Sequence, residues 1–188
     1  MSRAFVALLV ATWLVFPAAA ESASLFMDRI HERFSTLGAS GDLNERRSAC
    51  REIVATAVDI AGMTQATLAR NWNVVSAGMR ATAVGAVTRR VVSGCIDLMN
   101  KADTGEFIVE RVRERPAEAL LTVQLEREDG SHSLLVWKLR RLDSSWTIID
   151  ISRDGRSLVL NMQAEFENAL AANQGDLRKA FAAISGSR

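Results

Sequence analysis

The chain has 188 residues, with 23 basic and 22 acidic side chains, two cysteines and two prolines. A nucleic-acid-binding protein normally carries a basic excess that neutralises phosphates, so the near-zero net charge excludes that class of partner. The length fits one ordinary domain, and the sequence shows no internal repeat or low-complexity tract.

The first twenty residues have the composition of a secretory signal peptide. Arg3 supplies an early positive charge, an apolar run extends from Ala4 to Phe16, and Pro17 precedes three alanines. This run is shorter than the about 20 residues that a membrane-spanning helix needs. We therefore expect residues 1–20 to be cleaved after Ala20, which leaves an exported, soluble single domain over residues 21–188 with 22 basic and 22 acidic side chains.

Four segments with apolar residues at helical spacing precede any strand pattern. The expected helices are residues 24–37, a segment starting near Asp42, a short helix capped by Thr64 that ends near Trp72, and a long helix capped by Ser76 that reaches about Asn100. The second of them places Cys50, Ile53, Val54 and Ala57 on one face.

The two cysteines, Cys50 and Cys95, fall on apolar faces of the second and fourth expected helices. In an oxidising compartment they can form one disulfide, which the loop-entropy account values at about 4 kcal/mol. Two buried free thiols would serve equally well as small apolar side chains. Both states stay open, because helix faces do not fix the distance between two Cα atoms.

After Gly105 the pattern changes to that of strands. The expected strands are residues 107–113, 119–126, 133–141 and 146–153. Short connections, including the hairpin signal Asp129-Gly130, favour an antiparallel meander. Two more helices follow, one from Ser157 and one from Asp176. This order indicates an α+β domain whose helices lie against one face of a curved four-stranded antiparallel sheet.

Alternate residues of neighbouring strands share one face of a sheet, which groups several apolar side chains into a common wall. The candidates for the wall of an apolar cavity are Leu121, Val123, Leu135, Trp137, Leu139, Ile149 and Ile151. Leu158, Met162 and Phe166 of the next helix join them, and the flexible thioether of Met162 adapts to variable ligands. Periodicity does not distinguish a cavity wall from ordinary core, so core packing remains the alternative for each residue.

The sequence contains no His-x-x-x-His, Cys-x-x-Cys or Gly-x-Ser-x-Gly motif, so metal-dependent hydrolysis and serine-nucleophile chemistry have no support. Two carboxylates invite a catalytic interpretation, Asp150 between two isoleucines and Asp59. For both we favour a structural role, as a hydrogen-bond acceptor or a helix cap. We expect no enzymatic activity, no metal and no cofactor.

The segment WTIIDISRDGRSLVLNMQAEFENAL, from Trp146 to Leu170, combines a strand, an Asp-Gly turn and an amphipathic helix. It resembles the carboxy-terminal signature of the MlaC family, the periplasmic phospholipid carriers also called toluene-tolerance proteins. The residues that carry this resemblance are Trp146, Ile148, Asp150, Gly155, Ser157, Leu158, Phe166 and Leu170. The stretch from Val58 to Trp72 is similar to the family's aspartate followed by an LG-W or LA-W element.

The resemblance implies an NTF2-like α+β domain in which an apolar cavity between helices and sheet holds lipid acyl chains. It also implies a carrier that shuttles phospholipid across the periplasm. The implied partners are an inner-membrane ABC transporter complex with an MCE-domain protein, and an outer-membrane lipoprotein complex.

The chain departs from the family in having no tyrosine, and Trp137, Ile149 and Met162 stand where tyrosines are common. One branch of the family accompanies hopanoid biosynthesis, so a polycyclic lipid is an alternative cargo. The alternatives from other classes are an NTF2-like enzyme with Asp150 or Asp59 as a general base, and a periplasmic adaptor that binds a protein through an apolar sheet face.

Overall fold

The computed structural model describes residues 21–38, 42–102, 107–126 and 130–185. Within these ranges the elements are α1 (Ala23–Gly38), α2 (Leu43–Ala57), α3 (Ile60–Leu68), the 3-10 helix η1 (Ala69–Asn73), α4 (Ala77–Ala102), β1 (Phe107–Glu114), β2 (Glu118–Glu126), β3 (His132–Leu142), β4 (Ser145–Arg153), β5 (Arg156–Ser157), α5 (Leu158–Ala172) and α6 (Leu177–Ile184). The predicted α+β class is confirmed. None of the described helices is both long enough and apolar enough to cross a bilayer.

Side-chain caps begin most of these helices where the sequence predicts them. Asp42 caps α2 by accepting a hydrogen bond from the Asn44 backbone amide, and Asp176 caps α6. The Ser76 hydroxyl accepts from the Met79 amide at 3.3 Å, and that of Ser157 from the Leu160 amide at 3.1 Å. Local capping chemistry therefore sets the starts of α2, α4, α5 and α6.

The prediction that Thr64 caps the third helix is wrong. Asp59 is the N-cap of α3, because its carboxylate accepts from the Gly62 amide at 2.8 Å and its own backbone amide donates to Ile148 at 2.9 Å. The Thr64 hydroxyl instead donates to the Ile60 carbonyl inside the helix. The helix thus starts just after the bridge between Val58 and Ile148 of β4, and its cap lies five residues earlier than the side-chain pattern suggested.

The five strands form one antiparallel sheet in the order β1-β2-β3-β4-β5, which confirms the meander and adds a short fifth strand. The β4–β5 connection is the predicted Asp154-Gly155 turn, in which both residues have positive φ, 49° and 79°. This is the conformation that favours Asp-Gly in two-residue hairpins. The other predicted turn is Asp129-Gly130, and its Asp129 lies outside the described residues.

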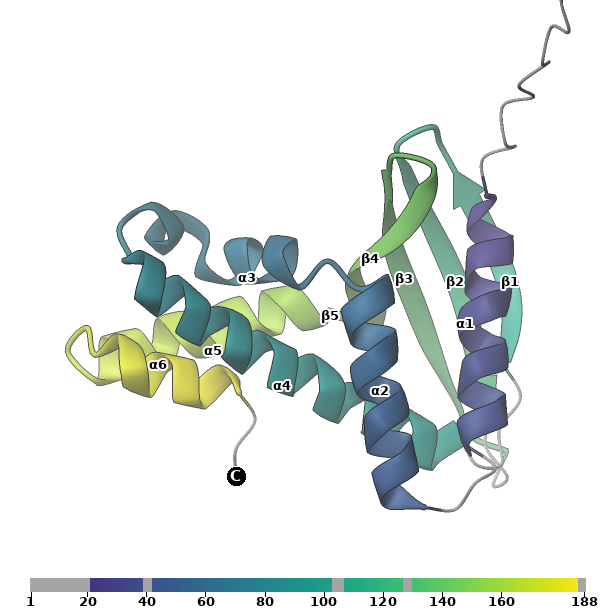
Figure 1. Cartoon of the computed structure of the whole chain (residues 1–188), viewed down its shortest axis with the longest axis horizontal. Coiled ribbons are helices and arrows are strands. Elements are labelled where there is room, and N and C mark those ends of the chain that lie inside the picture. The colour runs from purple at the N-terminus through teal and green to yellow at the C-terminus, as the bar shows by residue number, and fades with distance from the viewer. Residues whose placement is uncertain (1–20, 39–41, 103–106, 127–129, 186–188) are drawn as a thin grey trace, which may run out of the picture.

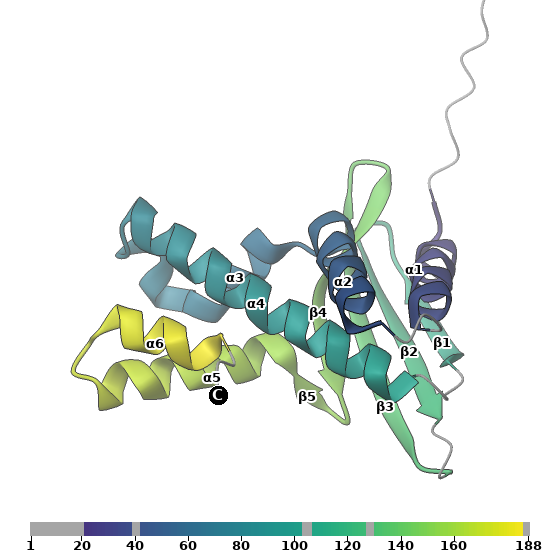
Figure 2. The same cartoon turned by 60° about the horizontal axis from the view of Figure 1, so that its bottom comes forward.

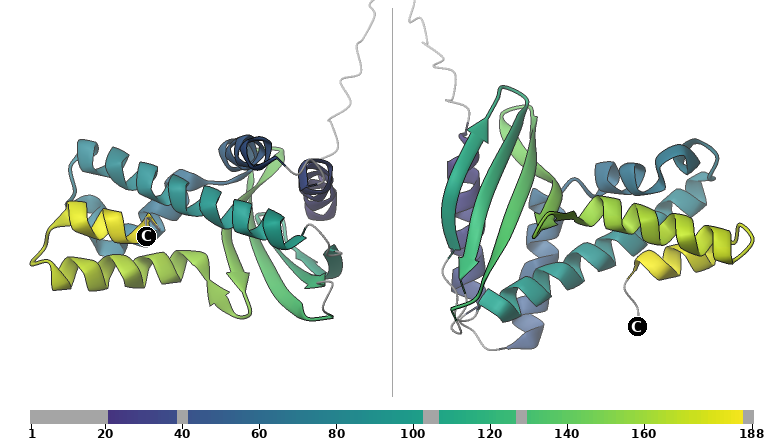
Figure 3. Two further views of the ribbon diagram at one scale, coloured as in Figure 1. Left: turned by 90° about the horizontal axis from the view of Figure 1, so that it is seen from below. Right: turned by 180° about the vertical axis from the view of Figure 1, so that it is seen from behind.

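Helices α1 and α2 lie against one face of the sheet (Figure 1). Seen from behind, the opposite face is not crossed by any helix of the described ranges (Figure 3, right). Helices α3, α5 and α6 form a helical part beside the sheet, and the long α4 runs from that part past α2 (Figure 2) and ends at the lower end of the sheet in the view of Figure 1. The molecule therefore has a sheet part and a helical part, joined by α4.

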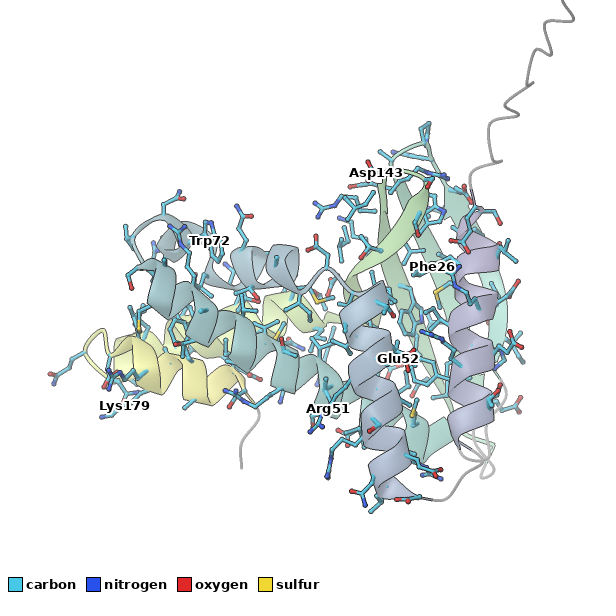
Figure 4. All side chains as sticks on the ribbon, in the orientation of Figure 1. Phe26, Arg51, Glu52, Trp72, Asp143 and Lys179 are labelled. Carbon is cyan, nitrogen blue, oxygen red and sulfur yellow. A yellow bond between two sulfur atoms is a disulfide. The ribbon has the colours of Figure 1, made fainter. Side chains whose placement is uncertain are left out.

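Each part has its own buried apolar side chains. In the sheet part, Phe26 on α1 packs toward the sheet, and in the helical part Phe166 and Phe181 stack with ring centroids 5.7 Å apart. Figure 4 places Trp72 at the far end of the helical part, where the Arg80 guanidinium lies 4.8 Å above its ring. Trp72 thus anchors η1 to α4.

Candidate functional site

A cavity of about 540 Å³ lies between α2 and α4 on one side and the sheet on the other. Its interior is apolar: α2 and the residue after it contribute Ile53, Val54 and Val58, α4 contributes Val91, Gly94, Cys95 and Leu98, and the strands contribute Leu135, Trp137, Ile148 and Ile151. Phe34 of α1 and Leu158 at the start of α5 complete this lining. The volume falls within the roughly 300–1,000 Å³ of ordinary ligand sites.

The two helices that line the cavity are joined by a disulfide, and one of them has a glycine among its lining residues. A disulfide joins Cys50 of α2 to Cys95 of α4, with their Cα atoms 5.8 Å apart. At Gly94, a β-carbon would meet no atom within 4 Å. Gly94 is exposed and is one of the residues that line the cavity, so a side chain at this position has room to extend.

The rim of the cavity is polar and comes from the β4–β5 hairpin and the two flanking helices. The hairpin contributes Arg153, Asp154 and Arg156, while α4 contributes Asp97 and α5 contributes Asn161. An apolar interior with a charged rim suits an amphipathic ligand, because apolar groups gain by burial and charged groups stay hydrated.

Four of the ten predicted wall residues line this cavity, namely Leu135, Trp137, Ile151 and Leu158. Leu121, Val123 and Leu139 lie on the same face of the sheet and are at most 2% exposed, but they belong to the packed core. Met162 and Phe166 are fully buried in the helical part. These five residues are therefore packed in the core and do not line the cavity.

Ile149 lies on the other face of the sheet. The β3–β4 pairing shifts between Lys138 and Leu139, so that Asp150 pairs with Lys138 and Ile148 with Leu139, and Ile149 has no partner. A bulge of this kind changes which residues share a face. Ile148 therefore takes the inward position that strict alternation assigned to Ile149.

The residues of α2 and α4 that line the cavity were not among the predicted wall residues. Ile53 and Val54 lie on the apolar face that the periodicity identified in the second expected helix, and Val91 and Leu98 lie on α4. The pattern did not show which part of each face meets the sheet and which meets open space. That information depends on the crossing of α2 and α4, which the sequence pattern does not encode.

The two carboxylates considered for catalysis come together on the opposite side of β4, in a separate pocket of about 350 Å³. Asp59 caps α3 and pairs with Arg140. Asp150 accepts from the Ser157 hydroxyl at 2.6 Å, the Ile151 amide at 2.9 Å and the Val159 amide at 3.1 Å. Both carboxylates are thus engaged in holding the starts of helices.

Within the described ranges, no group of three or more His, Cys, Asp or Glu side chains is placed to hold a metal ion. His31 lies beside Phe107, with ring centroids 5.1 Å apart, and His132 is exposed at the start of β3. The structure therefore places neither histidine in the cavity.

Comparisons with known proteins give a family and a fold. A family model described as "MlaC protein" matches residues 26–185. Among solved structures, the phospholipid-binding protein from Ralstonia solanacearum in complex with a phospholipid aligns with a TM-score of 0.70 at 12% identity, covering 85% of this chain and 96% of that one. No curated protein matches the sequence.

Proposed function

Because the chain belongs to the MlaC family, we propose that it is a periplasmic carrier that encloses the acyl chains of a phospholipid in the cavity between α2, α4 and the sheet. The observation that carries this proposal is the apolar cavity of about 540 Å³ with a charged rim. The Ralstonia solanacearum structure, which has the same fold and holds a phospholipid, supports it.

The physical task of such a carrier is to shield acyl chains from water. Each buried methylene gains about 0.8 kcal/mol, so a lipid leaves a membrane only for a site of comparable apolarity. We assign this shielding to the four predicted wall residues that line the cavity, Leu135, Trp137, Ile151 and Leu158, together with the α2 and α4 residues opposite them. Chemical conversion of the lipid forms no part of this proposal.

The cellular setting belongs to the same proposal. Residues 1–20, which lie outside the described ranges, act as a signal peptide that directs the chain to the periplasm. There the protein exchanges lipid with an inner-membrane ABC transporter complex containing an MCE-domain protein and with an outer-membrane lipoprotein complex. Membership of the MlaC family supports this assignment.

Filling the cavity at Gly94 tests the proposal. The variant Gly94→Leu adds a large side chain at a residue that lines the cavity and has no atom within 4 Å of a β-carbon, so we expect lipid recovered from the natively purified protein to fall at least fivefold. Its stability should stay equal or rise by up to about 1 kcal/mol, because leucine favours a helix more than glycine does. Lipid is measured by mass spectrometry after extraction, and stability by urea unfolding.

The matched control is Gly78→Leu, on the same helix. Gly78 is exposed, does not line the cavity, and has equally open space around a β-carbon. This variant should retain the lipid content of the unaltered protein. Equal lipid content in the Gly94 and Gly78 variants would show that the cavity is not the lipid site.

A further inference from the structure

Two successive residue pairs of strands β3 and β4 bring polar groups to the cavity, and we call these pairs the inner level and the rim level. Trp137 and Ile151 are paired residues of these strands and form the inner level. Leu135 and Arg153 are the next inward-facing pair, and Arg156 of β5 pairs with Arg153 at the rim. Because two residues of a strand span roughly 7 Å, the Cα atoms of Arg153 and of Ile151, the partner of Trp137, are about that far apart along the sheet.

The two arginines at the rim are free to bind an anion. Among the described residues, neither the Arg153 nor the Arg156 guanidinium has a hydrogen-bond or ion-pair partner. Asp154 also lies at the rim, but one of its carboxylate oxygens already accepts from the Leu134 amide at 2.9 Å. Paired guanidiniums match the oxygen geometry of a phosphate.

The indole of Trp137 supplies a buried donor without an acceptor. Trp137 is 3% exposed and lines the cavity, and its Nε1 finds no hydrogen-bond partner in the described part of the chain. An unsatisfied buried donor costs free energy, and an indole N–H can only donate. A ligand that brings a carbonyl oxygen to this depth would remove that cost.

We propose that Trp137, Arg153 and Arg156 form a site for the ester and phosphate groups of a glycerophospholipid. The indole donates to an acyl ester carbonyl, and the two guanidiniums bind the phosphate. The three-carbon glycerol unit joins these groups and spans a distance similar to that between the two levels. This assignment rests on the proposed function and deepens it, because a hopanoid hydrocarbon offers neither group.

The proposed hydrogen bond from the Trp137 indole to a lipid carbonyl requires a movement of neighbouring side chains. The Trp137 nitrogen is buried, so an entering lipid must displace the side chains over it before the bond forms. The free energy gained by satisfying the donor favours that displacement. The acyl chains meanwhile occupy the apolar lining below, around Val54, Val91 and Leu98.

The first experiment tests the indole. Lipid-free protein is incubated with vesicles that contain equal amounts of diacyl phosphatidylglycerol and its dialkyl ether analogue, which has the same chains but no carbonyl. Mass spectrometry then gives the ratio of the two lipids bound. We expect the unaltered protein to favour the diacyl lipid about 2- to 10-fold, as for one neutral hydrogen bond, and Trp137→Phe to show a ratio near one.

The second experiment tests the arginines with vesicles that contain diacyl phosphatidylglycerol and diacylglycerol of the same chains. The unaltered protein should favour the phosphate-bearing lipid at least tenfold, and Arg153→Gln/Arg156→Gln should lose most of that preference. The control Arg47→Gln/Arg178→Gln removes the same charge from exposed positions outside the cavity and should keep it. Inorganic phosphate at millimolar concentration should not displace the bound lipid.

These readouts are ratios within one sample, so a variant of lower stability does not change them. A ratio near one for the unaltered protein in either experiment, or an unchanged ratio in the matching variant, would overturn the assignment of that group. Displacement by inorganic phosphate would reassign the arginines to a free anion. If the unaltered protein binds none of these lipids, the proposed function itself fails.

Discussion

Asp150 illustrates how a half-buried carboxylate in an apolar strand serves the fold. Its two oxygens accept from the Ser157 hydroxyl and from two backbone amides, one of them Val159 at the start of α5. Ser157 in turn caps α5 through the Leu160 amide. One side chain thus links β4, the hairpin and the helix that follows, and the sequence predicted this structural role from its surroundings.

The substitution Asp150→Ala should lower the free energy of unfolding by roughly 1.5–3 kcal/mol, because it removes charge-assisted hydrogen bonds and leaves the Val159 amide without its acceptor. Urea unfolding monitored by tryptophan fluorescence measures this change. The control is Asp28→Ala, at an exposed position on α1 that makes no side-chain hydrogen bond or ion pair within the described ranges, and it should change stability by less than about 0.5 kcal/mol. Equal effects in the two variants would refute the role of Asp150.

At the scale of the elements, apolar periodicity and capping residues predicted the helices and four of the strands. The two-residue strand β5 has no periodicity of its own, and only its turn was predictable. The side-chain pattern also did not predict the bulge in β4 near Lys138, because Ile148 and Ile149 are equally apolar and either can face inward. Register depends on pairing geometry, which the alternation of side chains leaves open at such a position.

The disulfide connects the two helices that form one side of the cavity, so its loss should affect the whole sheet part. Replacing both cysteines, as Cys50→Ala/Cys95→Ala, should lower the free energy of unfolding by about 2–5 kcal/mol. A reductant should destabilise the unaltered protein and leave the double variant unchanged. Alkylation of two thiols per chain in the unreduced, exported protein would contradict the bond.

At the scale of the molecule, the cavity lies between the sheet and the two helices α2 and α4. Ile53, Val91 and Leu98 are as apolar as the residues of the packed core, so composition does not mark them as cavity wall. They line the cavity because of how α2 and α4, which the disulfide joins, are placed against the sheet. The sequence therefore predicted an apolar interior and part of its sheet wall, but not the helical wall.

The family and the cavity together lead to one claim about the whole molecule, that it carries lipid. The most direct measurement is extraction and mass spectrometry of lipid from the exported protein, purified without detergent. We predict recovery of a phosphate-bearing glycerolipid in an amount comparable to the protein. Repeated recovery of stable, folded protein without lipid, which also takes up none from vesicles, would contradict the claim.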